Sequence, residues 1–108
     1  MHLYRINEEG TPVAMEDVIE WARWFETAER HVAEDLVTTP GGESVRVSTV
    51  FLGIDHNHGM YGPPVLWETM IFRKGEGCEQ WRHVSRASAK AMHEMIVAAL
   101  KDGKELCW

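Results

Sequence analysis

Residues 48–72 read STVFLGIDHNHGMYGPPVLWETMIF, and this stretch decides the fold of the chain. Two runs rich in β-branched and aromatic residues, 44–54 and 65–73, flank a ten-residue loop from Asp55 to Pro64. Such runs are typical of strands, and the lack of clean polar–apolar alternation in the first run indicates a central place in a sheet. Loops held between rigid strands often carry functional side chains, so we expect any site here.

The remaining sequence predicts strands and helices on both sides of this stretch. Further strands are expected at 3–6, 31–38 and 79–84, with turns at 7–10, 40–42 and 74–77. Apolar residues three and four apart predict helices over 14–30 and 86–102, the second with Ser85 as its N-cap. This order predicts a single α+β domain, 1–108, in which an antiparallel meander of about four to five strands has two helices packed on one face.

Charge and composition exclude several classes of protein. The net charge is −6, and no basic face is visible in the sequence order. Proteins that neutralise phosphates need such a face, so direct nucleic-acid binding is not expected. The sequence has no apolar leader and no run of 18 apolar residues, which argues against a signal peptide and a membrane span. Cys78 and Cys107 form no CxxC pair, and we expect free thiols in the cytoplasm.

His56 and His58 lie two residues apart at the end of the first run. In extended backbone such residues point to the same side. Two imidazoles, with Asp55 or Glu68 adding an oxygen, could therefore hold a divalent metal ion. The alternative is a solvated loop with an Asx turn at Asp55, since Gly59 follows at once and the chain can turn there. No other cofactor is expected.

Glu68 stands inside an apolar run, where a carboxylate must be exposed or paired because an unpaired buried charge is costly. If the hairpin closes at 74–77, Glu68 lies opposite His83, and a slip of one residue would place Arg82 there instead. The structural alternative is an ion pair of Glu68 with Arg82 or Arg46.

These residues together predict a site for a polar ligand at the loop and the adjoining hairpin. We assign no catalytic residue, because the G-x-S-x-G elbow and the glycine-rich phosphate loop are both missing. The predicted ligand-binding residues are Asp55, His56, Tyr61, Trp67, Glu68 and His83.

The same stretch resembles a signature of small proteins encoded by bacteriophages and prophages, many from actinobacterial hosts. In those proteins a VSTVFLGLDH strand leads through a Gly-Pro-rich loop into FETM-F. Glu20-Trp21 and Trp24-Phe25-Glu26 resemble their EWA-LFE pattern. The resemblance implies an accessory protein in the host cytoplasm. This chain differs at His58, where aromatic or small residues are common.

Two functions are compatible with these observations. The first is a non-enzymatic binding protein for a host protein or a small polar metabolite. The alternative is a small metal-dependent or acid–base enzyme that uses Asp55, His56, His58 and Glu68. Five tryptophans and two apolar helix stripes leave apolar surface to be covered, and we expect a homodimer because two-fold pairing is the commonest arrangement.

Overall fold

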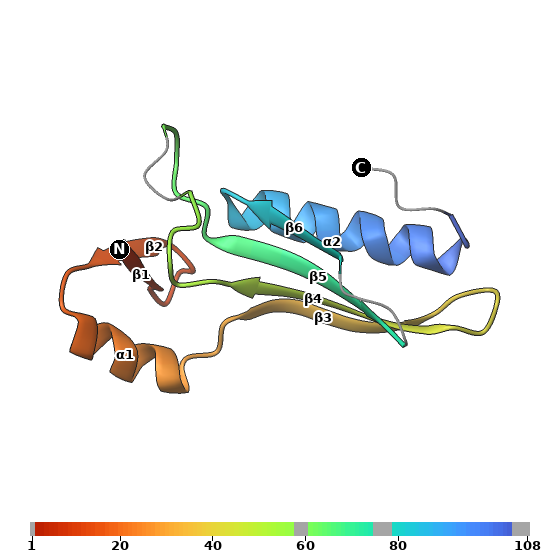
Figure 1. The fold of residues 1–108 in the computed structure, drawn as a ribbon, viewed down its shortest axis with the longest axis horizontal. Helices are drawn as coiled ribbons and strands as arrows, with labels where there is room; N and C mark the ends of the chain where they lie inside the picture. Colours follow the sequence, from red (N-terminus) through yellow and green to blue (C-terminus); the bar gives the residue numbers. More distant parts are fainter. Residues whose placement is uncertain (1, 58–60, 75–78, 105–108) are drawn as a thin grey trace.

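The computed structural model describes residues 2–57, 61–74 and 79–104, and within these ranges it contains two antiparallel sheets and two helices (Figure 1). The elements in chain order are β1 (Leu3–Ile6), β2 (Pro12–Met15), α1 (Val18–Thr27), β3 (His31–Thr38), β4 (Ser44–Phe51), β5 (Trp67–Arg73), β6 (Glu79–His83) and α2 (Arg86–Lys101).

The larger sheet is a meander of β3, β4, β5 and β6, each antiparallel to the next. This arrangement confirms the predicted α+β fold and the central position of the strand that begins at Ser44. The smaller sheet is the β1–β2 hairpin, whose turn is closed by the Asn7 side chain accepting the N–H groups of Glu9 and Thr11. A bridge between Leu3 and Ile54 joins this hairpin to the segment that follows β4.

The first helix is shorter than predicted, because residues 12–15 form β2 and not a helical turn. Pairing explains the difference: Met15 lies opposite Leu3, and Ala14 lies opposite Tyr4. Asp17 then begins the helix, since its carboxylate accepts the N–H groups of residues 19 and 20. The predicted end at residue 30 is also too late, because Ala28 has extended backbone.

The two runs that flank the loop keep their predicted positions but form shorter strands. β4 ends at Phe51 and not at 54, and two residues later Gly53 has a φ of +79°. A side chain there would be strained, and its Cβ would stand 3.1 Å from the Phe25 ring of α1. Gly53 thus bends the chain away from the sheet and allows α1 to approach. β5 begins at Trp67, two residues later than the predicted start at residue 65.

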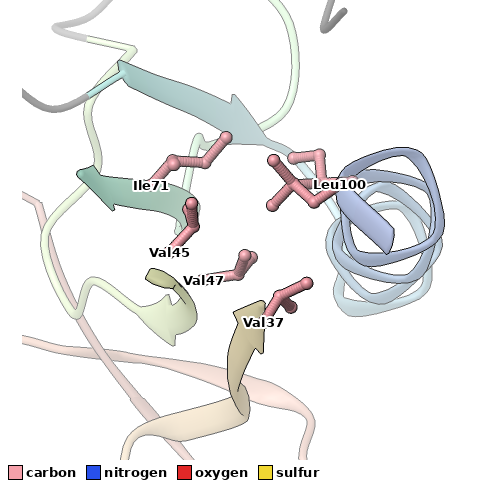
Figure 2. Packing of buried hydrophobic residues seen from close by; sticks show 6 residues of the cluster. Val37, Val45, Val47, Ile71 and Leu100 are labelled. Carbon is pink, nitrogen blue, oxygen red and sulfur yellow. The ribbon is translucent and has the colours of Figure 1, made fainter. Parts of the chain in front are cut away.

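Helix α2 covers one face of the meander. Alternate residues of β3, β4 and β5 point toward it and form a core with Ile96 and Leu100 (Figure 2). The strand residues of this core are Val37, Val45, Val47 and Ile71. Ser85 caps α2 as predicted, since its hydroxyl accepts the N–H of Ser88.

A second cluster lies at the end of the same face. Phe51, Leu66, Trp67 and Ala89 are buried there, and Trp24 of α1 packs edge-to-face on Phe51 with ring centroids 6.1 Å apart. Helix α1 otherwise lies against β1, beyond the end of the meander (Figure 1). The prediction that both helices pack on one face of the sheet is therefore wrong, because α1 follows the separate β1–β2 hairpin and, of the two described helices, only α2 covers the meander.

The other face of the meander is called the open face below, because no described helix packs on it. Its residues alternate with those of the core and share a side through the cross-strand register. They are His31, Glu34, Leu36, Thr38, Ser44, Arg46, Ser48, Val50, Glu68, Met70, Phe72, Gln80 and Arg82.

We predict that Ile96→Ala destabilises the fold by about 2–5 kcal/mol, because it leaves a cavity between α2 and the sheet. Met95→Ala is the matched control, since Met95 is the next residue of the same helix but is half exposed; it should change stability by only about 0.5 kcal/mol. Urea unfolding of both variants checks this. Equal losses would mean that α2 does not bury the predicted face.

Candidate functional site

The loop is organised by Asp55. One carboxylate oxygen of Asp55 accepts the N–H groups of Asn57 and Val65, both at 2.8 Å, so the Asx turn predicted as the alternative is confirmed. The Asn57 amide donates across the loop to the carbonyl of Pro63 at 3.1 Å. Asp55 therefore holds the two ends of the loop together, and its carboxylate has a structural role.

His56 and Tyr61, the other predicted loop residues that the structure describes, lie in different environments. Nδ1 of His56 lies 2.8 Å from the carbonyl oxygen of Ile54, and Tyr61 is fully exposed. His58 lies outside the described residues. Within the described part of the chain, no cluster of three or more His, Cys, Asp and Glu side chains could hold a metal ion.

Glu68 pairs with Arg82 and not with His83. Nε of Arg82 donates to Oε2 of Glu68 at 3.0 Å, and the register places the two residues opposite each other. The predicted pairing with His83 is therefore wrong, and the predicted ion pair with Arg82 is confirmed. Glu68 lies on the open face, whereas Trp67 and His83 are partners on the face toward α2. Alternation along β5 thus separates Trp67 from Glu68.

A different set of polar side chains converges inside the core, and we call it the polar chain. Asp35 Oδ2 lies 2.7 Å from His93 Nε2, and His93 Nδ1 lies 2.8 Å from Thr49 Oγ1. Thr49 Oγ1 lies 2.8 Å from Thr69 Oγ1, which lies 3.2 Å from His83 Nε2. The contacts run from β3 through α2, β4 and β5 to β6, so they cross the whole sheet.

Sequence reasoning named His83 but missed the other four members of the polar chain. The last helix was predicted from its apolar residues, and His93 was not counted among them. It stands four residues after Ala89 and three before Ile96, both of which are buried. That spacing places His93 on the buried face of α2. The pairing of Thr49 with His93 spans 44 positions, and nothing local in the sequence indicates it.

Asp35, His93 and Thr49 have the order of an acid–base–nucleophile triad. Thr49 has no exposed surface and His93 is only 2% exposed, whereas half of the Asp35 carboxylate is exposed. A shallow groove of about 300 Å³ passes Asp35 and His93 on the helix side. Because the hydroxyl lies behind the imidazole, a substrate in that groove cannot reach Thr49.

A pocket of about 290 Å³ lies where the β1–β2 turn meets the start of β3 and the start of α2. Of the predicted ligand-binding residues only Trp67 lines it, so the predicted set does not share this pocket. Its lining mixes acids and cations, including Glu8, Glu29, Arg30 and Arg86. Arg30 is already engaged, because it stacks on Phe25 and donates to the carbonyl of Phe51.

No protein family, curated protein or solved structure matched the chain in the three comparisons that we made. Within residues 2–57, 61–74 and 79–104, neither helix is long and apolar enough to cross a membrane.

The first prediction from the site concerns pH. Burial lowers the pKa of the His83 imidazole below its usual value. In the unfolded chain this ring takes up a proton below about pH 6.5, while the native ring resists it. The stability that depends on neutral His83 is therefore complete above that pH and is lost as the pH falls toward the lower native pKa.

We test this with urea unfolding of the native chain and of His83→Gln between about pH 7.5 and pH 5.5, a window that brackets the ordinary pKa of histidine. The His83→Gln variant should lose less stability over this interval, because its side chain does not titrate. The same loss in both proteins would contradict the role of His83.

The second prediction concerns the loop. Asp55→Ala should cost about 1–3 kcal/mol, because two backbone N–H groups lose a charged acceptor. Asp55→Asn keeps an acceptor oxygen and should cost less. Tyr61→Ala is the loop control and should change stability by no more than about 0.5 kcal/mol. Thermal unfolding measures the stability of each variant. If Tyr61→Ala lost as much stability as Asp55→Ala, Asp55 would not hold the loop closed.

Proposed function

We propose that this chain is a non-enzymatic binding protein, a phage or prophage accessory protein of the host cytoplasm, that forms a homodimer through its open face. The observation that carries the proposal is the pairing of charges on that face. Arg46 donates to Glu34 at 3.0 Å, and Arg82 donates to Glu68 at the same distance. The open face is therefore neutral in a chain whose net charge is −6, so two copies can meet there without repulsion.

The composition of the open face supports the same reading. Interfaces are enriched in Arg, Met and aromatic residues and depleted in Lys, and the face contains Arg46, Arg82, Met70 and Phe72 but no lysine. The Arg46 guanidinium lies over the Phe72 ring, 4.1 Å from its centroid, which presents a flat surface. Leu36 stands beside this pair and is 74% exposed.

The size of the face limits the strength of the contact. Four strands about 4.8 Å apart, with about seven residues each at about 3.3 Å, give a face of roughly 450 Å² in projection. A standard interface buries about 800 Å² on each partner. The face is therefore suited to a small interface, and small interfaces are typical of weak contacts.

Burial of the triad-like arrangement supports a binding role over the enzymatic alternative. A nucleophile has to touch its substrate, and Thr49 is sealed between α2 and the sheet. Two residues assigned to the alternative also lie apart: Asp55 clasps the loop, while Glu68 of β5 is paired with Arg82 on the open face.

We predict that Leu36→Glu abolishes the dimer, because it places two unpaired carboxylates in the interface. Sedimentation at about 100 μM, which is well above a micromolar dissociation constant, should give the native chain twice its 12.4 kDa mass and the variant the monomer mass. Val18→Glu is the matched control: Val18 is similarly exposed, but on α1, and this variant should remain dimeric.

A native chain that stays monomeric at this concentration would refute the homodimer. Loss of the dimer in Val18→Glu as well would mean that the result for Leu36→Glu is not specific to the open face, and it would count against this assignment of the interface. If the native chain is monomeric but captures a host protein, and Leu36→Glu abolishes that capture, the occupant of the open face is a host protein.

A further inference from the structure

The number of protons that the polar chain needs can be counted from its hydrogen bonds. Three contacts join His93 Nδ1, Thr49, Thr69 and His83 Nε2 in series, and each contact needs one proton. Each threonine hydroxyl supplies one, which makes two protons for three contacts. The third proton must come from one of the two histidine nitrogens at the ends.

The Asp35 carboxylate decides which nitrogen supplies it when His93 is neutral. An ionised carboxylate can only accept, so His93 uses its Nε2 proton on Asp35 and leaves Nδ1 bare. Thr49 then donates to Nδ1, Thr69 donates to Thr49, and His83 donates to Thr69 from Nε2. Every donor and acceptor in the series is satisfied.

A proton on His93 reverses the series. The His93 cation donates from Nδ1 to Thr49, Thr49 donates to Thr69, and Thr69 needs a bare Nε2 on His83. The His83 ring must then carry its single proton on Nδ1. If both end nitrogens carried protons, one hydroxyl proton would have no acceptor in the buried series, which is costly.

Within the described residues, three charged or titratable side chains are found beside the His93 ring. Asp35 faces His93 from β3, and Glu94 and Lys101 of α2 line the groove beside these two residues. From β4 and β5 the groups that face the rings are Thr49 and Thr69, which do not titrate in this range. Burial lowers the pKa of His83, which favours the neutral form of that ring.

From this geometry we infer that the polar chain is a two-state proton relay: one and only one of His93 Nδ1 and His83 Nε2 carries a proton in the folded protein. Protonation of His93, which belongs to α2 and is bonded to edge strand β3, therefore changes the tautomer of His83 on the opposite edge strand β6. The relay couples the two edge strands through the core and is independent of the proposed binding role of the open face.

The test is a pH titration of the ¹⁵N-labelled full chain by long-range ¹H–¹⁵N NMR, which shows for each ring nitrogen whether it is protonated. While His93 is neutral, both His93 and His83 should be protonated on Nε2 only. As His93 becomes cationic, His83 should lose its Nε2 proton and gain one on Nδ1 over the same pH range. If His93 Nδ1 and His83 Nε2 were both protonated, or both unprotonated, in the folded protein, the proposed relay would be wrong.

Thr69→Val removes the hydroxyl next to His83, and the His83 tautomer should then no longer follow His93. Thr69→Ser keeps the hydroxyl and should preserve the coupling, and Thr38→Val controls for a threonine change at an exposed position of the same sheet. Persistent coupling in a folded Thr69→Val protein would also overturn the relay. If acid unfolds the chain before either ring titrates, the tautomers observed in the folded protein test the proposal. It is then wrong unless one and only one of His93 Nδ1 and His83 Nε2 carries a proton.

Discussion

The contact between α2 and one face of the meander is the constraint on which the rest of the structure depends. A single helix fills one side of the sheet with Ile96 and Leu100 against the inward residues of β3, β4 and β5. Strand alternation then sends every second residue to the other side. The same packing that builds the core therefore leaves the open face, whose charges are paired within the sheet and on which Leu36 is exposed to a partner.

The core under α2 also contains polar groups, and these fix where the helix sits. A helix held only by apolar contacts could shift along the sheet at modest cost. His93 cannot shift, because both of its ring nitrogens are engaged, one by β3 and the other by β4. Buried polar groups without partners are costly, so the polar chain favours one position of α2 over its neighbours. The Asp35 carboxylate completes the chain from the solvent side and also points a charge inward from edge strand β3, which discourages further strand pairing there.

Much of the fold could be predicted from local patterns. β-Branched runs indicated the meander, and Ser85 marked the start of the last helix. The first helix was predicted to begin too early because Ala14 and Met15 fit a helical stripe, whereas pairing with β1, a tertiary effect, makes them a strand. The site was harder to predict, because a shift of one residue in strand register moves every side chain to the other face of the sheet. The observed register places Glu68 opposite Arg82, whereas His83 lies opposite Trp67 on the other face. The polar chain joins residues up to 58 positions apart, and no local spacing reveals such contacts.

The central claim is that a partner molecule covers the open face, and the exposure of methyl groups to a soluble paramagnetic agent tests it most directly. As the protein concentration rises through the micromolar range, the account predicts that the agent broadens the Leu36 methyl signals progressively less. The Val18 methyl signals on α1 should remain equally broadened throughout, because α1 stays in solvent. Constant broadening of Leu36 at all concentrations, or equal protection of Val18, would contradict the account.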